Sequence, residues 1–222
     1  MRRGIGIFLL SASLLLISCG TSEKEDLSVS SVPAEETETA EETAEAEKSH
    51  SLIVYFSLAG EQYGVGRIKE GNTAILADFV EEKTGADTFE IVPVNSYPDD
   101  LQGLMDVTEK EQETGALPDY VGDVENWEEY TDVYIGYPLW YDTLPRIVIH
   151  FLQDHDFSGK TIYPFNTSAA EGLLGTVDTI RSICTGAEVK EGLTVRGSVV
   201  QNDRDTTEQA VDDWLLETSQ QE

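Results

Sequence analysis

The chain has 222 residues, of which 40% are hydrophobic and 9% aromatic, enough apolar material for the core of one domain. Acidic residues outnumber basic ones by 43 to 14, and the formal charge of -29 would repel phosphate backbones, which argues against nucleic-acid binding. Two cysteines are too few for a disulfide scaffold or a four-thiolate metal site. The chain has only three histidines, and we expect no bound metal.

Residues 1–18 have the features of an export signal. Two arginines follow the first methionine, and the apolar run from Phe8 to Ile17 is too short to span a bilayer comfortably. The run ends in Leu-Ile-Ser-Cys19, which resembles the bacterial lipobox, in which the cysteine is acylated and becomes the mature N-terminus. We therefore expect a lipoprotein signal peptide and a membrane anchor at Cys19. The alternative is an ordinary signal peptide with a chance cysteine.

Residues 19–50 are expected to follow as the acylated cysteine and an acidic tether. This segment contains no aromatic residue, and ten acids face only two lysines. Nothing in it can form a core, which predicts a disordered, self-repelling linker. A helix over 34–48 is the alternative, but no apolar stripe is present to dock it.

The folded domain is expected at residues 51–222, where predicted strands and helices alternate. Continuous apolar runs indicate strands that are buried on both faces, and apolar residues at helical spacing indicate helices. The predicted strands are 52–56, 88–94, 132–137, 161–165 and one that includes 193–195. The predicted helices are 74–83, 98–113, 144–152, one marked by Leu173, Val177, Ile180 and Cys184, and one that a capping box, Thr206 to Gln209, would open. This alternation predicts an α/β sandwich with a parallel sheet, whose ligands bind beyond the carboxyl ends of the strands.

The loop after the first predicted strand could hold a phosphate. Ser57, Asn72 and Thr73 offer hydroxyl and amide groups near a helix N-terminus, where exposed N–H groups favour an anion. The loop has neither Gly-x-Gly-x-x-Gly nor the Gly-Lys-Ser/Thr ending of a nucleotide triphosphate loop, which argues against ATP and GTP. Alternatively, Asn72 only caps the helix. Arg67 and Lys69 could approach a phosphate or remain surface charges.

Two further loops could contact a ring system. Trp140 and Tyr141 follow the third predicted strand, and large aromatic side chains are costly to expose without a stacking partner. The alternative is that they fold back onto the domain. After the fourth strand, 164–172 offers small residues, hydroxyls and main-chain donors that could line a polar heterocycle, or could form an ordinary turn.

Together the three loops resemble those of the flavodoxin-like family, in particular its bacterial lipoprotein-anchored, FMN-binding branch. Ser57 followed by Gly-Asn-Thr at 71–73 is similar to the family's phosphate loop, with an insertion at 61–70 that splits it. The segment 136–141 looks like the isoalloxazine loop, and 164–168 is similar to the third flavin loop.

The resemblance implies bound FMN and a flavodoxin-like three-layer sandwich, with a five-stranded parallel sheet of order 2-1-3-4-5. It implies phosphate contacts from Ser57, Asn72 and Thr73, a ring contact from Trp140 with Pro138, Leu139 and Tyr141 beside it, and polar contacts from Thr167 and Ser168. The chain departs from the family pattern at Leu58, where an arginine is common, and at 169–171, where the family is often glycine-rich.

The function that this resemblance implies is electron transfer through FMN, by a lipid-anchored protein on the extracytoplasmic face of the cell membrane. Its partner would be a redox protein with a basic docking face or a small electron acceptor. An FMN-dependent NAD(P)H:quinone-type reductase is one alternative, and a flavodoxin-shaped binding module that has lost its cofactor is another. Cys184 is expected to be a buried structural thiol, and His150 and His155 are expected to be structural or exposed.

Overall fold

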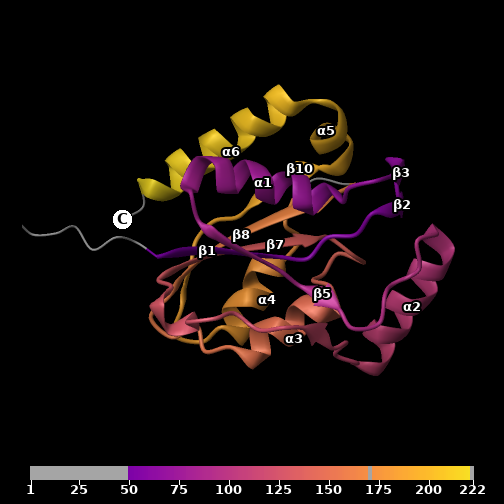
Figure 1. The fold of residues 1–222 in the computed structure, drawn as a ribbon, viewed down its shortest axis with the longest axis horizontal. Helices are drawn as coiled ribbons and strands as arrows, with labels where there is room; N and C mark the ends of the chain where they lie inside the picture. Colours follow the sequence, from indigo (N-terminus) through magenta and orange to yellow (C-terminus); the bar gives the residue numbers. More distant parts are fainter. Residues whose placement is uncertain (1–49, 170–171, 221–222) are drawn as a thin grey trace, which may run out of the picture. The chain divides into compact units, whose positions relative to one another are not determined.

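The computed structural model describes residues 50–169 and 172–220 (Figure 1). The predicted signal peptide, the acylation site at Cys19 and the tether lie outside these residues. In the part that is described, no helix is long and apolar enough to cross a membrane.

A parallel sheet forms the centre of the domain. Its strands are β1 (Ser51–Tyr55), β4 (Asp87–Glu90), β7 (Asp132–Pro138), β8 (Thr161–Ser168) and β10 (Leu193–Arg196). They lie in the order β4-β1-β7-β8-β10. Counted along the chain this is the predicted order 2-1-3-4-5, which is therefore confirmed. A short additional strand, β9 (Glu188–Val189), pairs with the start of β8, so the sheet has six strands and not five.

Helices cover both faces of the sheet (Figure 1). The helices α1 (Asn72–Thr84), α5 (Gly197–Asn202) and α6 (Arg204–Ser219) lie on one face, and α3 (Arg146–Asp154) and α4 (Thr176–Ile183) lie on the other. Two apolar clusters separate these layers because neighbouring strand residues point to opposite faces. In β1, Ile53 packs under α1 and α6, whereas Leu52 and Val54 pack under α3.

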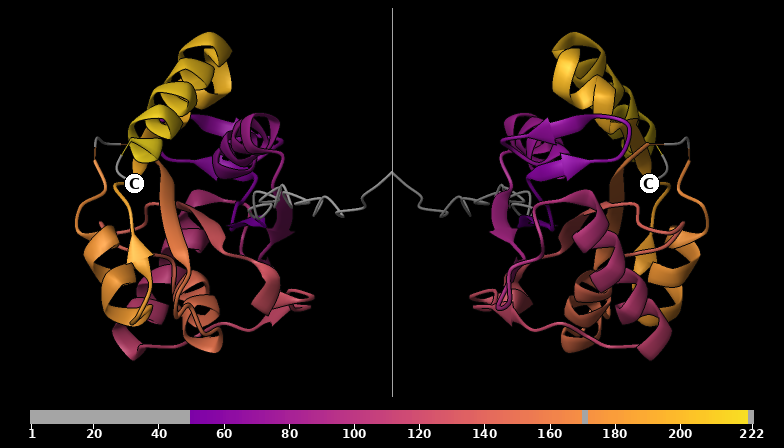
Figure 2. Two further views of the ribbon diagram at one scale, coloured as in Figure 1. Left: turned by 90° about the vertical axis from the view of Figure 1, so that its left-hand side faces the viewer. Right: turned by 90° about the vertical axis from the view of Figure 1, so that its right-hand side faces the viewer.

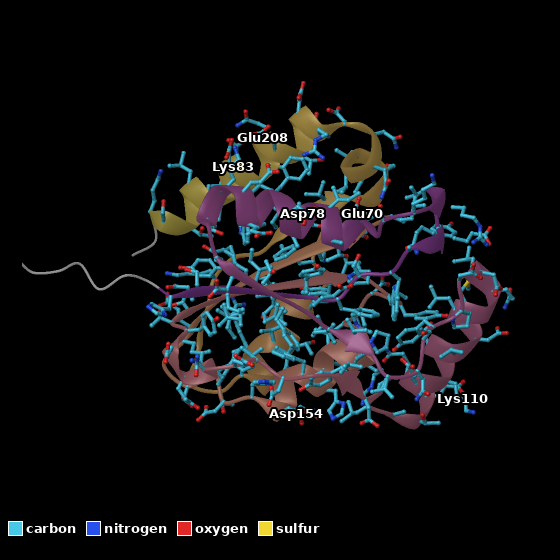
Figure 3. The ribbon with its side chains drawn as sticks, in the orientation of Figure 1. Glu70, Asp78, Lys83, Lys110, Asp154 and Glu208 are labelled. Atoms are coloured by element: carbon cyan, nitrogen blue, oxygen red, sulfur yellow. The ribbon has the colours of Figure 1, made fainter. Side chains whose placement is uncertain are left out.

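Ion pairs add to the apolar contact between α1 and α6. The Lys83 ammonium lies 2.6 Å from Glu208 and 3.0 Å from Asp212, and Figure 3 shows the first pair at the top of the molecule. On the other face, Cys184 is buried at the end of α4, and burial raises the pKa of its thiol to about 12. The expectation of a buried structural thiol is confirmed.

Two small hairpins and one further helix lie outside the main layers. The hairpins pair β2 (Gly60–Gln62) with β3 (Gly66–Ile68), and β5 (Val92–Pro93) with β6 (Tyr120–Val121). The helix α2 (Leu101–Thr114) contacts β2 and α3, and a single 3-10 turn, η1, spans Trp127–Glu129. The predicted insertion is thus the β2–β3 hairpin, which lies with α2 at the carboxyl end of the sheet (Figure 2, right).

Two sequence predictions of elements need correction. The strand predicted at 88–94 is divided, because Ile91 forms the last hydrogen bond to β1 and the chain then pairs with β6. The cap of the last helix is Asp203 and not Thr206: the carboxylate of Asp203 accepts hydrogen bonds from the N–H and hydroxyl of Thr206. These bonds lower the pKa of Asp203, because they stabilise its ionised form.

Candidate functional site

Two adjoining cavities at the carboxyl ends of β1, β7 and β8 bring the predicted site residues together. The larger has a volume of about 250 Å³, and the smaller has about 10 Å³, room for one water molecule. Seven predicted residues line the larger cavity: Asn72, Pro138, Leu139, Trp140, Tyr141, Thr167 and Ser168. Ser57 and Thr73 line the smaller one, together with Asn72 and Trp140.

The split loop is rejoined in space at the N-terminus of α1. The Ser57 hydroxyl oxygen accepts a hydrogen bond from the Ala74 N–H at 3.0 Å. A β-carbon on Gly71 would lie 2.1 Å from that oxygen, so only glycine allows this approach. The N–H groups of Asn72 and Thr73 precede Ala74 in the same helical turn and have no intrahelical acceptor. This end of α1 can therefore donate hydrogen bonds to an anion.

The side chain of Asn72 carries unused hydrogen-bonding capacity. Its Oδ1 is buried and has no hydrogen-bond partner among residues 50–169 and 172–220. A buried polar atom without a partner costs about 1–3 kcal/mol, so a ligand that supplies a donor would stabilise the site. The amide packs closely against the first residue of α5, since a β-carbon on Gly197 would lie 2.4 Å from Asn72 Nδ2.

The two predicted threonines connect α1 to β8. Thr73 Oγ1 and Thr167 Oγ1 are 2.8 Å apart and both side chains are buried. Thr167 and Ser168 lie on β8 itself and not on the loop after it, because β8 extends to Ser168 and Thr167 is in register with Pro138 of β7. The polar side of the cavity is thus built on rigid strands.

Trp140 is held by the core and borders both cavities. Its indole packs edge-on against Phe56 at 5.4 Å and Tyr97 at 5.5 Å between ring centroids. The phenol of Tyr97 donates to Glu111, and burial and that carboxylate raise its pKa, so Tyr97 remains neutral. The ring therefore folds back onto the domain, as one of the two alternatives expected, and it also borders both cavities.

A tight turn fixes the loop that carries Trp140. Trp140 and Thr143 exchange two backbone hydrogen bonds, and the two residues between them have positive φ angles of 49° and 59°. Such a turn favours glycine or asparagine, so Tyr141 is strained there. The Tyr141 side chain is half-exposed, and its hydroxyl donates to the Met105 carbonyl of α2.

Sequence reasoning missed one side of the larger cavity. The hairpin contributes Gln62, Tyr63 and Val65, and α2 contributes Leu101, Leu104, Met105 and Thr108. The sequence signals for this side were the insertion at 61–70 and the helix predicted at 98–113, and neither was assigned to a wall of the site. Arg67 forms an ion pair with Asp99 at 2.9 Å, and no lysine or arginine of the described chain lines either cavity.

The predicted structural histidines lie away from this site. His155 has both ring nitrogens within hydrogen-bond distance of oxygen atoms, on Phe151 and Asp123. His150 Nδ1 lies 2.9 Å from the carbonyl oxygen of Pro118. Both rings are therefore engaged in contacts within the domain, as expected.

Comparison with known proteins gives a family and a fold. A family model described as flavodoxin matches residues 51–215. A candidate flavoprotein from Bacteroides eggerthii has a TM-score of 0.62 at 27% identity, over 78% of this chain and 99% of that one. A flavoprotein from Lactobacillus acidophilus, solved in complex with FMN, has a TM-score of 0.54 at 18% identity, over 76% and 99% of the two chains. The comparison with curated proteins gave no match.

Proposed function

The chain belongs to the flavodoxin family, and we propose that it binds FMN at the carboxyl ends of β1, β7 and β8 and carries electrons outside the cytoplasmic membrane. The observation that carries the proposal is the convergence of Ser57, Asn72 and Thr73 on the N-terminus of α1, beside a cavity bordered by Trp140. Bound FMN would supply one- or two-electron transfer, and the chain would supply binding and orientation.

The residues fit the phosphate and the sugar chain of FMN. The free N–H groups at the start of α1 suit a phosphate, which needs no lysine or arginine when a helix N-terminus faces it. The unpartnered Asn72 Oδ1 is an acceptor, and a hydroxyl of the ribityl chain would supply its missing donor. Thr73 and Thr167 keep α1 and β8 together beneath these groups.

The apolar and polar walls fit the flavin ring. Trp140, Pro138 and Leu139 offer a water-excluding surface, while Thr167 and Ser168 offer hydroxyls for the polar edge of the ring. No lysine or arginine lines the cavity in the described part of the chain, so no charged side chain there would favour an anionic reduced ring.

The charge of the chain and its N-terminus support an extracytoplasmic carrier. The formal charge of -29 would attract a partner with a basic docking face and speed its encounter. The lipobox-like segment that ends at Cys19 supports a lipid anchor. We propose electron carriage in preference to a nicotinamide-dependent reductase, because nicotinamide cofactors are scarce outside the cytoplasm.

An absorption spectrum with an FMN titration tests the proposal. The purified protein is expected to show flavin absorption bands, or to acquire bound flavin when FMN is added. Steady-state oxidation of NADH and NADPH should be no faster than that by free FMN. A protein that binds no FMN would contradict the proposed cofactor, and rapid NADH turnover would indicate the reductase.

Replacing the proposed acylated cysteine should release the protein from the membrane. In Cys19→Ala no thiol is available to carry acyl chains, and stable anchoring requires two of them. We expect the variant to lose the mass of the lipid and to leave the membrane fraction or remain as uncleaved precursor. Cys184→Ala is the control, because that thiol is buried within the domain. Unchanged mass and membrane retention in Cys19→Ala would contradict acylation at this position.

A methyl group on Gly197, which lies against the Asn72 amide at the edge of the cavity, should weaken FMN binding without unfolding the domain. In Gly197→Ala the new methyl would meet the end of the Asn72 side chain, which can shift, and no backbone atom lies as close. We expect roughly tenfold weaker FMN binding, because a misplaced amide loses about one hydrogen bond. Ser198→Ala, at the next and exposed position of α5, should leave the affinity unchanged. An equal affinity in both variants would show that Asn72 makes no contact with FMN.

A further inference from the structure

The β2–β3 hairpin is fastened at its base to the start of α2. The Glu61 N–H donates to the Asp99 carbonyl at 2.8 Å, and the Glu61 carboxylate accepts from the Leu101 N–H at 3.3 Å. The Arg67 guanidinium pairs with the Asp99 carboxylate at 2.9 Å, and both side chains are largely exposed. Exposed ion pairs of this kind are weak, so the Arg67–Asp99 pair adds only a little to the cost of opening this contact.

The turn of the hairpin reaches the other side of the larger cavity. A β-carbon on Gly64 would lie 3.7 Å from the β-carbon of Ala169, just after β8. The side chain of Val65 lies 3.4 Å from the β-carbon position of Gly197, at the start of α5. The hairpin therefore crosses from α2 to β8 and α5, and its residues Gln62, Tyr63 and Val65 form the outer wall of the cavity.

Tyr63 lies at the turn of this hairpin and lines the cavity. With 73% of its surface exposed, it is the most exposed large apolar side chain of the described residues. Among those residues its ring makes no aromatic contact and its hydroxyl forms no hydrogen bond. A planar ring system in the cavity would give this phenol a stacking partner and bury its surface.

An outward movement of the outer wall would enlarge the larger cavity. The larger cavity measures about 250 Å³, whereas small-molecule sites typically measure about 300–1,000 Å³. The strands β7 and β8 and the Trp140 side chain pack on the apolar clusters, whereas no residue of the hairpin belongs to either cluster. Glycines with positive φ angles begin both of its strands, at Gly60 and Gly66, and allow its backbone to bend.

We propose that the β2–β3 hairpin is a movable wall of the FMN site, and that Tyr63 stacks on the flavin ring as a second aromatic contact besides Trp140. The proposal rests on the proposed function, because it requires FMN in the cavity. The hairpin opens to admit FMN, and closure places the Tyr63 ring against it. The base contact between Arg67 and Asp99 positions the hairpin and does not touch the ligand.

The test measures how fast and how tightly FMN binds to the full chain and to paired variants. We expect Tyr63→Ala to bind FMN about three- to tenfold more weakly, and Tyr63→Phe to bind it normally, since only the ring is required. Leu216→Ala, an exposed truncation on α6, is the matched control. Arg67→Ala should release FMN about two- to fivefold faster, whereas Lys69→Ala, which removes the same charge from the same insertion, should not.

Amide hydrogen exchange supplies a readout that does not depend on electron transfer. Exchange of the amides at 60–68 should slow when FMN is added to the native protein. If the native protein binds FMN, but Tyr63→Ala and Arg67→Ala bind and release it normally and exchange at 60–68 is unchanged, the hairpin is no part of the site and the proposed function stands. If the native protein binds no FMN, the proposed function fails and this inference fails with it.

Discussion

Riboflavin should bind at least about 100-fold more weakly than FMN, because it lacks the phosphate that the start of α1 is expected to hold. Each hydrogen bond to a charged group contributes about 1.5–3 kcal/mol, and the N–H groups of Asn72 and Thr73 offer two of them. Their loss would cost about 3 kcal/mol or more, which corresponds to over 100-fold in affinity. The positive end of the α1 dipole adds to this difference.

Flavin fluorescence titrations with both ligands measure this ratio, and a side-chain variant locates its origin. Asn72→Ala should bind FMN and riboflavin about equally less well if its amide contacts the ribityl chain, since both ligands carry that chain. If Asn72→Ala lowered the affinity for FMN alone, the Asn72 amide would instead contact the phosphate. Nearly equal affinities of the native protein for FMN and riboflavin would contradict a phosphate site at this helix.

The sequence predicted the parts of the fold that depend on local apolar patterns. The strands β1 and β7 are buried on both faces, and their continuous apolar runs have no other simple explanation. The convergence of the three loops followed from the rule that parallel strands present their carboxyl ends at one edge. The strand order came from the family resemblance, because periodicity does not fix which strands are neighbours.

The parts of the site that the sequence did not predict depend on contacts between residues that are far apart in the chain. The hydroxyl pair of Thr73 and Thr167 joins positions 94 residues apart, and no local pattern signals such a contact. The strands of the β2–β3 hairpin have three residues each, too few to show an alternation of apolar and polar residues. The short helix α5 has no apolar stripe of useful length, so the contact between Gly197 and Asn72 could not be predicted.

Replacing Trp140 by alanine should weaken FMN binding about ten- to 300-fold and raise the reduction potential of the bound flavin by some tens of millivolts. Stacking contributes about 0.5–1.5 kcal/mol beyond the apolar area that it buries, and the area adds roughly 1–2 kcal/mol. The oxidised ring is neutral and electron-poor, whereas the reduced ring tends to be anionic. The electron-rich indole therefore favours the oxidised state, and each 1.4 kcal/mol of that preference corresponds to about 59 mV for one electron.

The contacts of Trp140 with Phe56 and Tyr97 require a control, because its removal also leaves a gap in the core. Trp140→Phe keeps an aromatic ring at this position and should retain most of the affinity, with a smaller change in potential. Urea unfolding of the FMN-free variants separates lost stability from lost binding. Of the three tryptophans in the chain, Trp127 and Trp214 line neither cavity. Bound FMN should therefore quench the indole fluorescence of the native protein, and it should quench the fluorescence of Trp140→Ala much less. If Trp140→Ala retains the native affinity and potential, Trp140 serves the core alone, and Tyr141 becomes the ring contact to test on this loop.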